Sequence, residues 1–207
     1  SDDKNVVSYV SIKDDAGLSE AEIGINDTAK LKKLLGVLTD DVNITFNKRD
    51  EKIVSLSLNS ESTDVQYVIA DLSVIPSAPP LKKIPPFTVE IPLDAEFISK
   101  FVSSKGALAD VDTFTLMMNK KGKLEMIIGY SSINSNRIKL AVNAVEGKDT
   151  VTKNINFNAN HLKEILLANR DCTNAHLKVS EAGLASVEFV CGDITAEYYL
   201  VEVKSID

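Results

Sequence analysis

The apolar residues of this 207-residue chain follow the same pattern three times. In each copy, apolar positions at helical spacing predict a short amphipathic helix, and three alternating segments predict strands joined by tight turns. The copies run from Thr28 to Leu72, from Leu93 to Ala144 and from Asn158 to Val203. A segment like the end of a fourth copy, Asn5 to Ile25, precedes them. Because one repeating unit can set a whole architecture, we expect a protein built by repetition.

Each predicted helix has an apolar stripe on one side and polar residues on the other. The stripes are Leu31, Leu34, Leu35 and Leu38; Phe97, Ile98, Phe101 and Val102; and Leu162, Ile165 and Leu166. Residues that can cap the N-termini are Asn26 or Asp27, Asp94, and Asn158 or Asn160. We expect Gly106 to end the second helix.

The strand segments predict an α+β fold in which short helices cover one face of antiparallel sheets. After the first helix they read VNITF, KIVSLSL and VQYVIADL, and the later copies read alike. Ile53, Leu56 and Leu58 do not keep a two-residue step, so the register of the second segment is irregular. Two similar domains follow, the first with only its latter half intact.

The boundary between the domains lies where the prolines gather. All six fall between Ser73 and Pro92, at positions 76, 79, 80, 85, 86 and 92. Proline fixes φ and cannot donate to a sheet, so this stretch predicts a stiff extended connector. We therefore assign an N-terminal domain to residues 1–72, a connector to 73–87 and a C-terminal domain to 88–207. Residues 88–91 and 152–157 are each expected to form a strand before the following helix.

Composition excludes some classes of protein. Hydrophobic residues are 44% and charged residues 26%, which is ordinary for a folded domain. No apolar run approaches the ~18 residues of a membrane span, and SDDKNVVSYV has no charged-then-apolar leader, so no signal peptide is visible. The sequence starts without Met, so we expect a processed or incomplete chain. Its net charge of −7 argues against a protein that coats nucleic acid by adhesion.

Candidate catalytic chemistry is sparse. The two histidines, His161 and His176, lie outside any HExxH or GxSxG motif, and there is no Walker or GxGxxG loop. Cys172 and Cys191 can form a disulfide, although two buried free thiols in a cytosolic protein are the favoured interpretation. With no Cys/His cluster, we expect no metal, no cofactor and no catalytic residue. An enzyme is the weaker alternative.

Three segments resemble the processivity sliding clamps of DNA polymerases, in particular the T-even-type bacteriophage clamps, which are relatives of proliferating cell nuclear antigen. They are INDTAKLKKLLGVL, then ADLSVIPSAPPLKKIPPFTVEIPLDAEFISKF, and finally NFNANHLKEILLANR with the closing AEYYLVEV. The similarity covers nearly the whole chain as spacing and pattern. Such clamps open with a helix and strands that complete the first half of domain one, and that helix has no counterpart here.

The resemblance implies a DNA-clamp fold and a homotrimer that closes as a ring around duplex DNA, independently of sequence. Edge strands would pair between subunits. The ring would tether a replicative DNA polymerase and give processivity in viral DNA replication in the cytoplasm of a bacterial host. A clamp loader ATPase would open it, and transcription accessory proteins are further implied partners. The alternative is a structural or interaction β protein, such as a virion component, that never meets DNA.

The resemblance also assigns the helices to the lining of the ring. Three copies carry about −21, so the duplex would be held by enclosure and centred by a weakly positive lining. The candidate DNA-facing residues are Lys30, Lys32, Lys33, Lys100, Lys105, Lys163 and Arg170. A weaker candidate is the hairpin cluster of Lys120, Lys121 and Lys123. Alternatively, these side chains are merely the solvated faces of helices.

A pocket for a partner peptide is implied between the connector and the chain end. Its candidate residues are Val74, Ile75 and Pro76 with Tyr199, Leu200 and Val201. For Tyr199 and Val201, the two-residue period favours the alternative that they fill the core.

Overall fold

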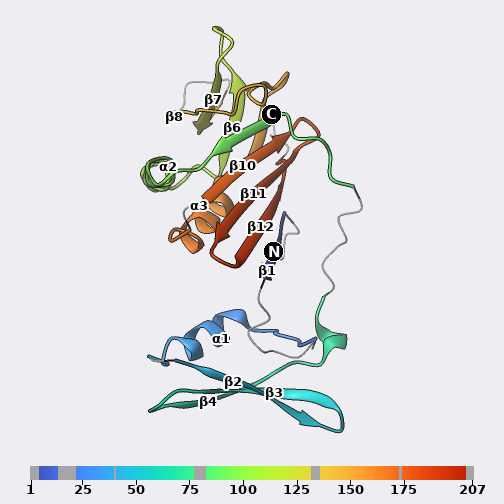
Figure 1. Ribbon diagram of the computed structural model, residues 1–207. Helices are drawn as coiled ribbons and strands as arrows, with labels where there is room; N and C mark the ends of the chain where they lie inside the picture. Colours follow the sequence, from blue (N-terminus) through green and yellow to red (C-terminus); the bar gives the residue numbers. More distant parts are fainter. Residues whose placement is uncertain are drawn as a thin grey trace. The chain divides into compact units, whose positions relative to one another are not determined.

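The computed structural model describes residues 5–13, 22–39, 41–76, 83–131, 136–172 and 174–203. They form two compact units, each with its own core (Figure 1). The smaller unit comprises residues 22–76, and the larger comprises 83–203 together with 5–13. All strand pairs in the three sheets are antiparallel. The predicted α+β fold class is confirmed.

The smaller unit is one helix and a three-stranded sheet. Its elements are α1 (Thr28–Leu35), β2 (Asn43–Arg49), β3 (Lys52–Asn59), β4 (Asp64–Val68) and the 3-10 helix η1 (Leu72–Val74). The strand order is β2-β3-β4. Four side chains form its buried core, namely Leu56, Leu58, Val65 and Tyr67. The leucines of α1 pack against this core only in part, and no residue of α1 is fully buried.

The irregular step that the sequence predicts in β3 is a bulge. The pairing of β2 with β3 shifts register at Asn47/Lys48, so that Val54 is the extra residue. A bulge moves the following side chains to the opposite face, which puts Leu56 and Leu58 in the core. The turn between these strands is only Asp50 and Glu51, both at positive φ.

The larger unit contains two copies of the strand-helix-three-strand motif and one added strand. The first copy is β5 (Val89–Pro92), α2 (Ala95–Ala107), β6 (Thr113–Met118), β7 (Leu124–Ile128) and β8 (Ile138–Ala141). The second is β9 (Ile155–Asn158), α3 (Ala159–Ala168), β10 (Asn174–Ser180), β11 (Leu184–Cys191) and β12 (Ile194–Val201). The added strand is β1 (Val6–Ile12), from the N-terminal end of the chain, which the sequence had placed with the N-terminal domain.

The two copies exchange their first strands. The sheet orders are β8-β7-β6-β9 and β1-β12-β11-β10-β5, so β9 completes the sheet of the first copy and β5 that of the second. The helices α2 and α3 lie side by side in this unit (Figure 1). One core joins both sheets and both helices, and Phe114 lies in it with ring centroids 5.6 Å from those of Phe101 and Phe157. The exchange makes the two copies one folding unit.

All three copies close in the same way, because the chain after the last strand returns to the segment before the helix. The bonds are Ala70 N to Gly24 O at 2.9 Å, Val145 N to Glu90 O at 2.8 Å and Val203 N to Asn156 O at 2.9 Å. At Gly24 the approach is so close that a Cβ would lie 2.6 Å from the Ala70 carbonyl oxygen, which requires glycine.

The helix starts are as predicted, with Asp27, Asp94 and Asn158 each accepting a backbone N–H three residues on. The prediction that Gly106 ends the second helix is wrong, because α2 continues to Ala107. Its end is tied down by a lysine that is described below.

The edges of the sheets differ in how they are covered. Edge strand β1 runs along β12 from Val6 opposite Leu200 to Ile12 opposite Ile194, and so covers the backbone of β12. In the part of the chain that the structure describes, six strands end a sheet with no strand beyond them, namely β1, β2, β4, β5, β8 and β9. Backbone bonds from the closing segments reach β5 at Glu90 and β9 at Asn156. Unpaired strand edges are ready to accept another strand.

Candidate functional site

The exposed side of α1 is the most positive helix surface in the described chain. Lys30, Lys32 and Lys33 are all exposed, and the helix contains no acidic residue. The nearest carboxylate in sequence, Asp27, caps the helix by accepting the N–H of Lys30 at 2.8 Å. None of the three ammonium groups forms an ion pair with a described residue. The positive charge of α1 is therefore free to act on a ligand.

The cations on the other two helices have acidic neighbours. Lys100 donates to Glu96 at 2.6 Å, and this bond raises the pKa of Lys100. The Lys163 ammonium lies 3.9 Å from Glu164, and the Arg170 guanidinium lies 3.8 Å from Asp171. Each pair offsets its own charge, so α2 and α3 contribute less positive potential than α1 does.

The prediction of Lys105 as a DNA-facing residue is wrong, because its side chain is buried. Only 3% of Lys105 is exposed, and its ammonium donates to the carbonyl oxygens of Leu108 at 3.3 Å and Ala109 at 3.1 Å. A cation at the C-terminus of a helix satisfies carbonyls that the helix leaves unpaired. Lys105 therefore holds the end of α2.

The predicted pocket residues of β12 point to opposite faces of the sheet. Leu200 is 1% exposed and belongs to the core, opposite Val6 and Ala185, so its assignment to a pocket is wrong. Tyr199 and Val201 face the outer side, because strand side chains alternate. Val201 is 46% exposed, which overturns the alternative that it fills the core. Tyr199 is buried on the outer face and is not part of the core cluster.

Sequence reasoning missed Tyr9, which completes this outer surface. The rings of Tyr9 and Tyr199 meet edge to face with their centroids 6.2 Å apart. Tyr9 is 42% exposed and lies directly opposite Glu197 in the pairing of β1 with β12. The alternating VVSYVSI segment was a strand signal, but nothing local revealed its partner 190 residues away. We call the residues Tyr9, Glu197, Tyr199 and Val201 the outer β1–β12 face.

Acidic groups are prominent on this side of the sheet. Glu188 and Glu197 are directly opposite each other across β11 and β12. Lys178 donates to Glu188 at 2.6 Å, whereas Glu197 accepts from the Ser186 hydroxyl at 2.9 Å. Burial, together with the nearby Glu197 carboxylate, raises the pKa of Tyr199. The phenol of Tyr199 therefore stays protonated.

The connector residues Val74, Ile75 and Pro76 lie at the end of the smaller unit. Asp71 caps η1 by accepting the N–H of Ser73 at 2.9 Å, and this bond lowers the pKa of Asp71. Val74 is 66% exposed and Ile75 is half-buried. The rest of the predicted connector up to position 82, with Pro79 and Pro80, lies outside the described residues. That these residues share a pocket with β12 stays a prediction.

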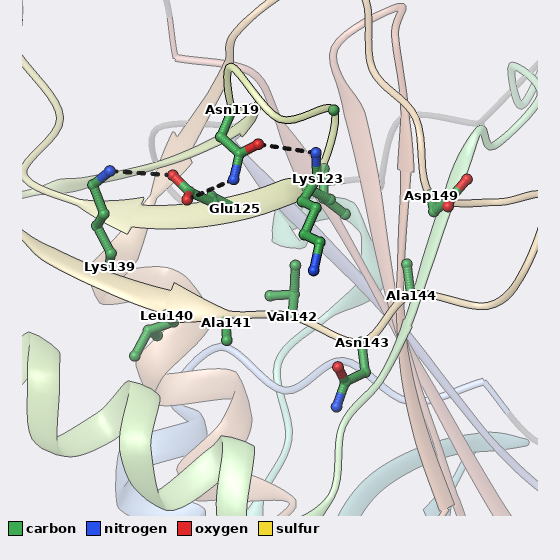
Figure 2. Close-up of a pocket in the computed structure, with 12 residues that line it drawn as sticks. Asn119, Lys123, Glu125, Lys139, Leu140, Ala141, Val142, Asn143, Ala144 and Asp149 are labelled. Atoms are coloured by element: carbon green, nitrogen blue, oxygen red, sulfur yellow. Dashed lines mark hydrogen bonds and ion pairs between the residues drawn. The ribbon is translucent and has the colours of Figure 1, made fainter.

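An open groove of about 620 Å³ runs along β8 and the β6–β7 turn (Figure 2). Its polar wall is built around Glu125, which accepts from Asn119 at 2.9 Å and from Lys139 at 3.3 Å. The bond from Asn119 lowers the pKa of Glu125. Asn119 in turn accepts the backbone N–H of Lys123 at 3.0 Å, which fixes the turn that carries the Lys120–Lys123 cluster. Leu140, Val142 and Ala144 supply the apolar side of the groove.

Few side chains in the described ranges are suited to metal binding or to catalysis. They contain no cluster of three or more His, Cys, Asp and Glu side chains able to hold a metal ion. Both cysteines are free thiols, and Cys191 is exposed, where the favoured interpretation had both buried. Burial raises the pKa of Cys172. Within the same ranges, none of the helices has the length and apolar character to span a membrane.

Comparison with known proteins places the fold. No protein-family model and no curated protein matches the sequence. Among solved structures, proliferating cellular nuclear antigen from Entamoeba histolytica matches with a TM-score of 0.68 at 15% identity, over 97% of this chain and 81% of that chain. The A. fulgidus antigen, solved with the C-terminal region of FEN-1, matches with a TM-score of 0.66 at 15% identity, over 98% and 82%. The predicted DNA-clamp fold is confirmed.

The burial of Lys105 gives a prediction that distinguishes a structural role of this residue from a place in the DNA-facing lining. Lys105→Met removes the ammonium that donates to the carbonyls of Leu108 and Ala109, and leaves Leu108 only the backbone N–H of Val111, so it should lower the free energy of unfolding by about 1–3 kcal/mol. The matched change Lys100→Met removes only an exposed ion pair and should leave stability unchanged. Urea unfolding of both variants measures the difference. Equal stability of the two variants would contradict the role given to Lys105.

Proposed function

We propose that this chain is the subunit of a DNA sliding clamp of the T-even bacteriophage type. Three copies would form a ring around duplex DNA and tether the replicative polymerase during viral DNA replication, in the cytoplasm of a bacterial host. The observation that carries the proposal is the pattern of sheet edges. Edge strand β1 covers β12 within the chain, whereas β4 and β8 have uncovered edges among the described residues.

Strand β4 occupies the same position in its copy of the motif as β12 does in the last copy. Each is the last strand of its copy, and the closing bond that follows it links Ala70 to Gly24 in one case and Val203 to Asn156 in the other. These bonds set Tyr67 equivalent to Leu200, and both are buried. In the same way β8 is equivalent to β1, since each comes just before the segment that leads into the next helix. Pairing β4 with β8 of the next copy would therefore repeat the pairing of β12 with β1.

Such a contact joins two different edges head to tail, and a head-to-tail contact gives a ring when its rotation closes. The groove beside β8 supports this role, because it offers apolar and charged groups next to the uncovered backbone. We take the number of subunits to be three, as the resemblance implies. Closure would leave β4 and β8 without unpaired edges, which removes a liability of each free subunit.

Enclosure explains how an acidic protein can hold DNA. A ring need not bind phosphates tightly, and a weakly positive lining suffices to centre the duplex. The main lining residues in this proposal are Lys30, Lys32 and Lys33 of α1, which form no ion pair with a described residue, and Lys100, Lys163 and Arg170 add to them. Lys105 is excluded because it is buried.

Partners would dock as short peptides. The antigen from A. fulgidus was solved with the C-terminal region of FEN-1 bound, which supports a peptide site on this fold. Here the site would combine the outer β1–β12 face with Val74, Ile75 and Pro76 of the connector. Its occupants would be segments of the polymerase, the clamp loader ATPase and transcription accessory proteins. The chain itself would be no enzyme, since ATP hydrolysis belongs to the loader.

Retention on DNA tests the ring. When subunits assemble in the presence of plasmid, rings should remain on nicked circles in high salt and slide off the linearised plasmid, as measured by gel filtration. Val68→Lys places a cation on the exposed edge strand β4, which is proposed to pair with β8, the strand that carries Lys139. This change should abolish both the mass of a trimer in solution and the retention of the protein on nicked circles. Val54→Lys, on the interior strand β3, is the matched control. Equal retention on circles and linear DNA, or a monomer at every concentration, would refute the clamp and favour a virion-type β protein.

Charge reversal on α1 tests the lining. The triple change Lys30→Glu, Lys32→Glu and Lys33→Glu should leave the trimer intact but reduce the amount captured on nicked circles at low salt by about tenfold, because local attraction speeds encounter with DNA. The control makes the same charge change on the exposed β2–β3 hairpin, at Lys48, Arg49 and Lys52. If both triple variants lose capture equally, α1 does not face the duplex.

A further inference from the structure

The outer β1–β12 face contains a carboxylate with no cationic neighbour. No Lys, Arg or His of the described residues forms an ion pair with Glu197. The other two carboxylates on this side of the sheet are matched, Glu90 by Lys148 and Glu188 by Lys178. Glu197 is thus the one outer carboxylate of this sheet, among the described residues, whose charge is left for another molecule.

This carboxylate is fixed in an unfavourable place. Glu188 lies directly opposite it on β11, and like charges in that position destabilise a sheet. The hydroxyl of Ser186, which is fully buried, nevertheless holds Glu197 by donating to its carboxylate at 2.9 Å. An ordered, partly buried carboxylate beside a like charge gains more from a cation than a freely solvated one does.

The neighbours of Glu197 suit a long basic side chain. Tyr9 lies directly across from it on β1 and is largely exposed, and an aromatic ring attracts a cation within about 6 Å. Val201 adds an exposed apolar contact two residues along β12. A lysine or arginine has the matching shape, because its methylene stem packs on apolar surface while its charged end reaches a carboxylate. A nucleic acid is disfavoured here, since its phosphates would meet the carboxylates.

We propose that the outer β1–β12 face selects partner peptides that carry a lysine or arginine next to an apolar anchor. The anchor packs on Tyr9 and Val201, and the basic group binds between the Glu197 carboxylate and the Tyr9 ring. This rests on the proposed role of the face as a peptide site, and it names the chemistry by which partners are chosen. Charge complementarity of this kind sets specificity more than raw affinity.

The test uses the full chain and a random dodecapeptide library displayed on yeast. We expect the selected peptides to be enriched in lysine or arginine beside an apolar residue. One selected peptide is then compared with its copy in which the basic residue is replaced by norleucine. The basic peptide should bind the unchanged protein about tenfold more tightly by titration calorimetry, and the preference should fade at high salt.

Glu197→Gln is the decisive variant, because glutamine keeps the oxygen that accepts from Ser186. It should erase the preference for the basic peptide and leave the affinity of the norleucine peptide unchanged. Glu188→Gln is the matched control and should keep the preference, since Lys178 already neutralises Glu188.

Two failures are distinguishable. Selected peptides without basic residues, or an unchanged preference in Glu197→Gln, would overturn the charge selection while leaving the peptide site standing. Tyr9→Ala should weaken both peptides. If Tyr9→Ala and Val201→Asp leave every selected peptide bound as before, or if the library yields no binder, the peptide site of the proposed function is itself refuted, and the selection with it.

Discussion

The need to satisfy the backbone along strand edges shapes this protein more than any single side chain does. Each edge presents a row of N–H and C=O groups that must pair with something. At β12 the chain supplies the partner itself, because β1 is brought back along its whole length. At β4 and β8 the described chain supplies none. Equivalent strands of the copies are therefore paired within the chain in one case, β12 with β1, and lack a partner strand in the other, β4 and β8. The proposed ring assumes that β4 and β8 of neighbouring chains pair as β12 and β1 do.

The helix-covered faces of the sheets and the outer β1–β12 face differ in the charges that they carry. The helix side carries cations, and the charges there are unequal. The three lysines of α1 form no ion pair with a described residue, whereas Lys100 of α2, Lys163 of α3 and Arg170 just after α3 each have an acidic neighbour. On the outer side, Glu197 is the carboxylate without a cationic partner among the described residues. In the proposed ring, enclosure would make strong attraction to DNA unnecessary, so the chain could remain acidic overall. The outer β1–β12 face would then discriminate among peptides by their basic residues.

Sequence patterns predicted the local structure well and the distant pairings poorly. The three helices and their caps depend on neighbouring residues, so Asp27, Asp94 and Asn158 could be identified directly. The exchange of β5 and β9, and the pairing of β1 with β12, join segments far apart, and alternation alone does not name a partner. Lys105 was misassigned because a lysine near a helix end looks solvated until the loop that folds over it is known. Tyr9 was missed for the same reason as β1.

Amide hydrogen exchange of β4 and β8, followed by mass spectrometry at protein concentrations above and below assembly, tests the edge pairing most directly. If the two strands pair between copies, their amides gain protection together at high concentration, while β12 is protected at both concentrations by β1 of its own chain. If the amides of β4 and β8 exchange at the same rate at every concentration, the strands do not pair and the ring does not close through them.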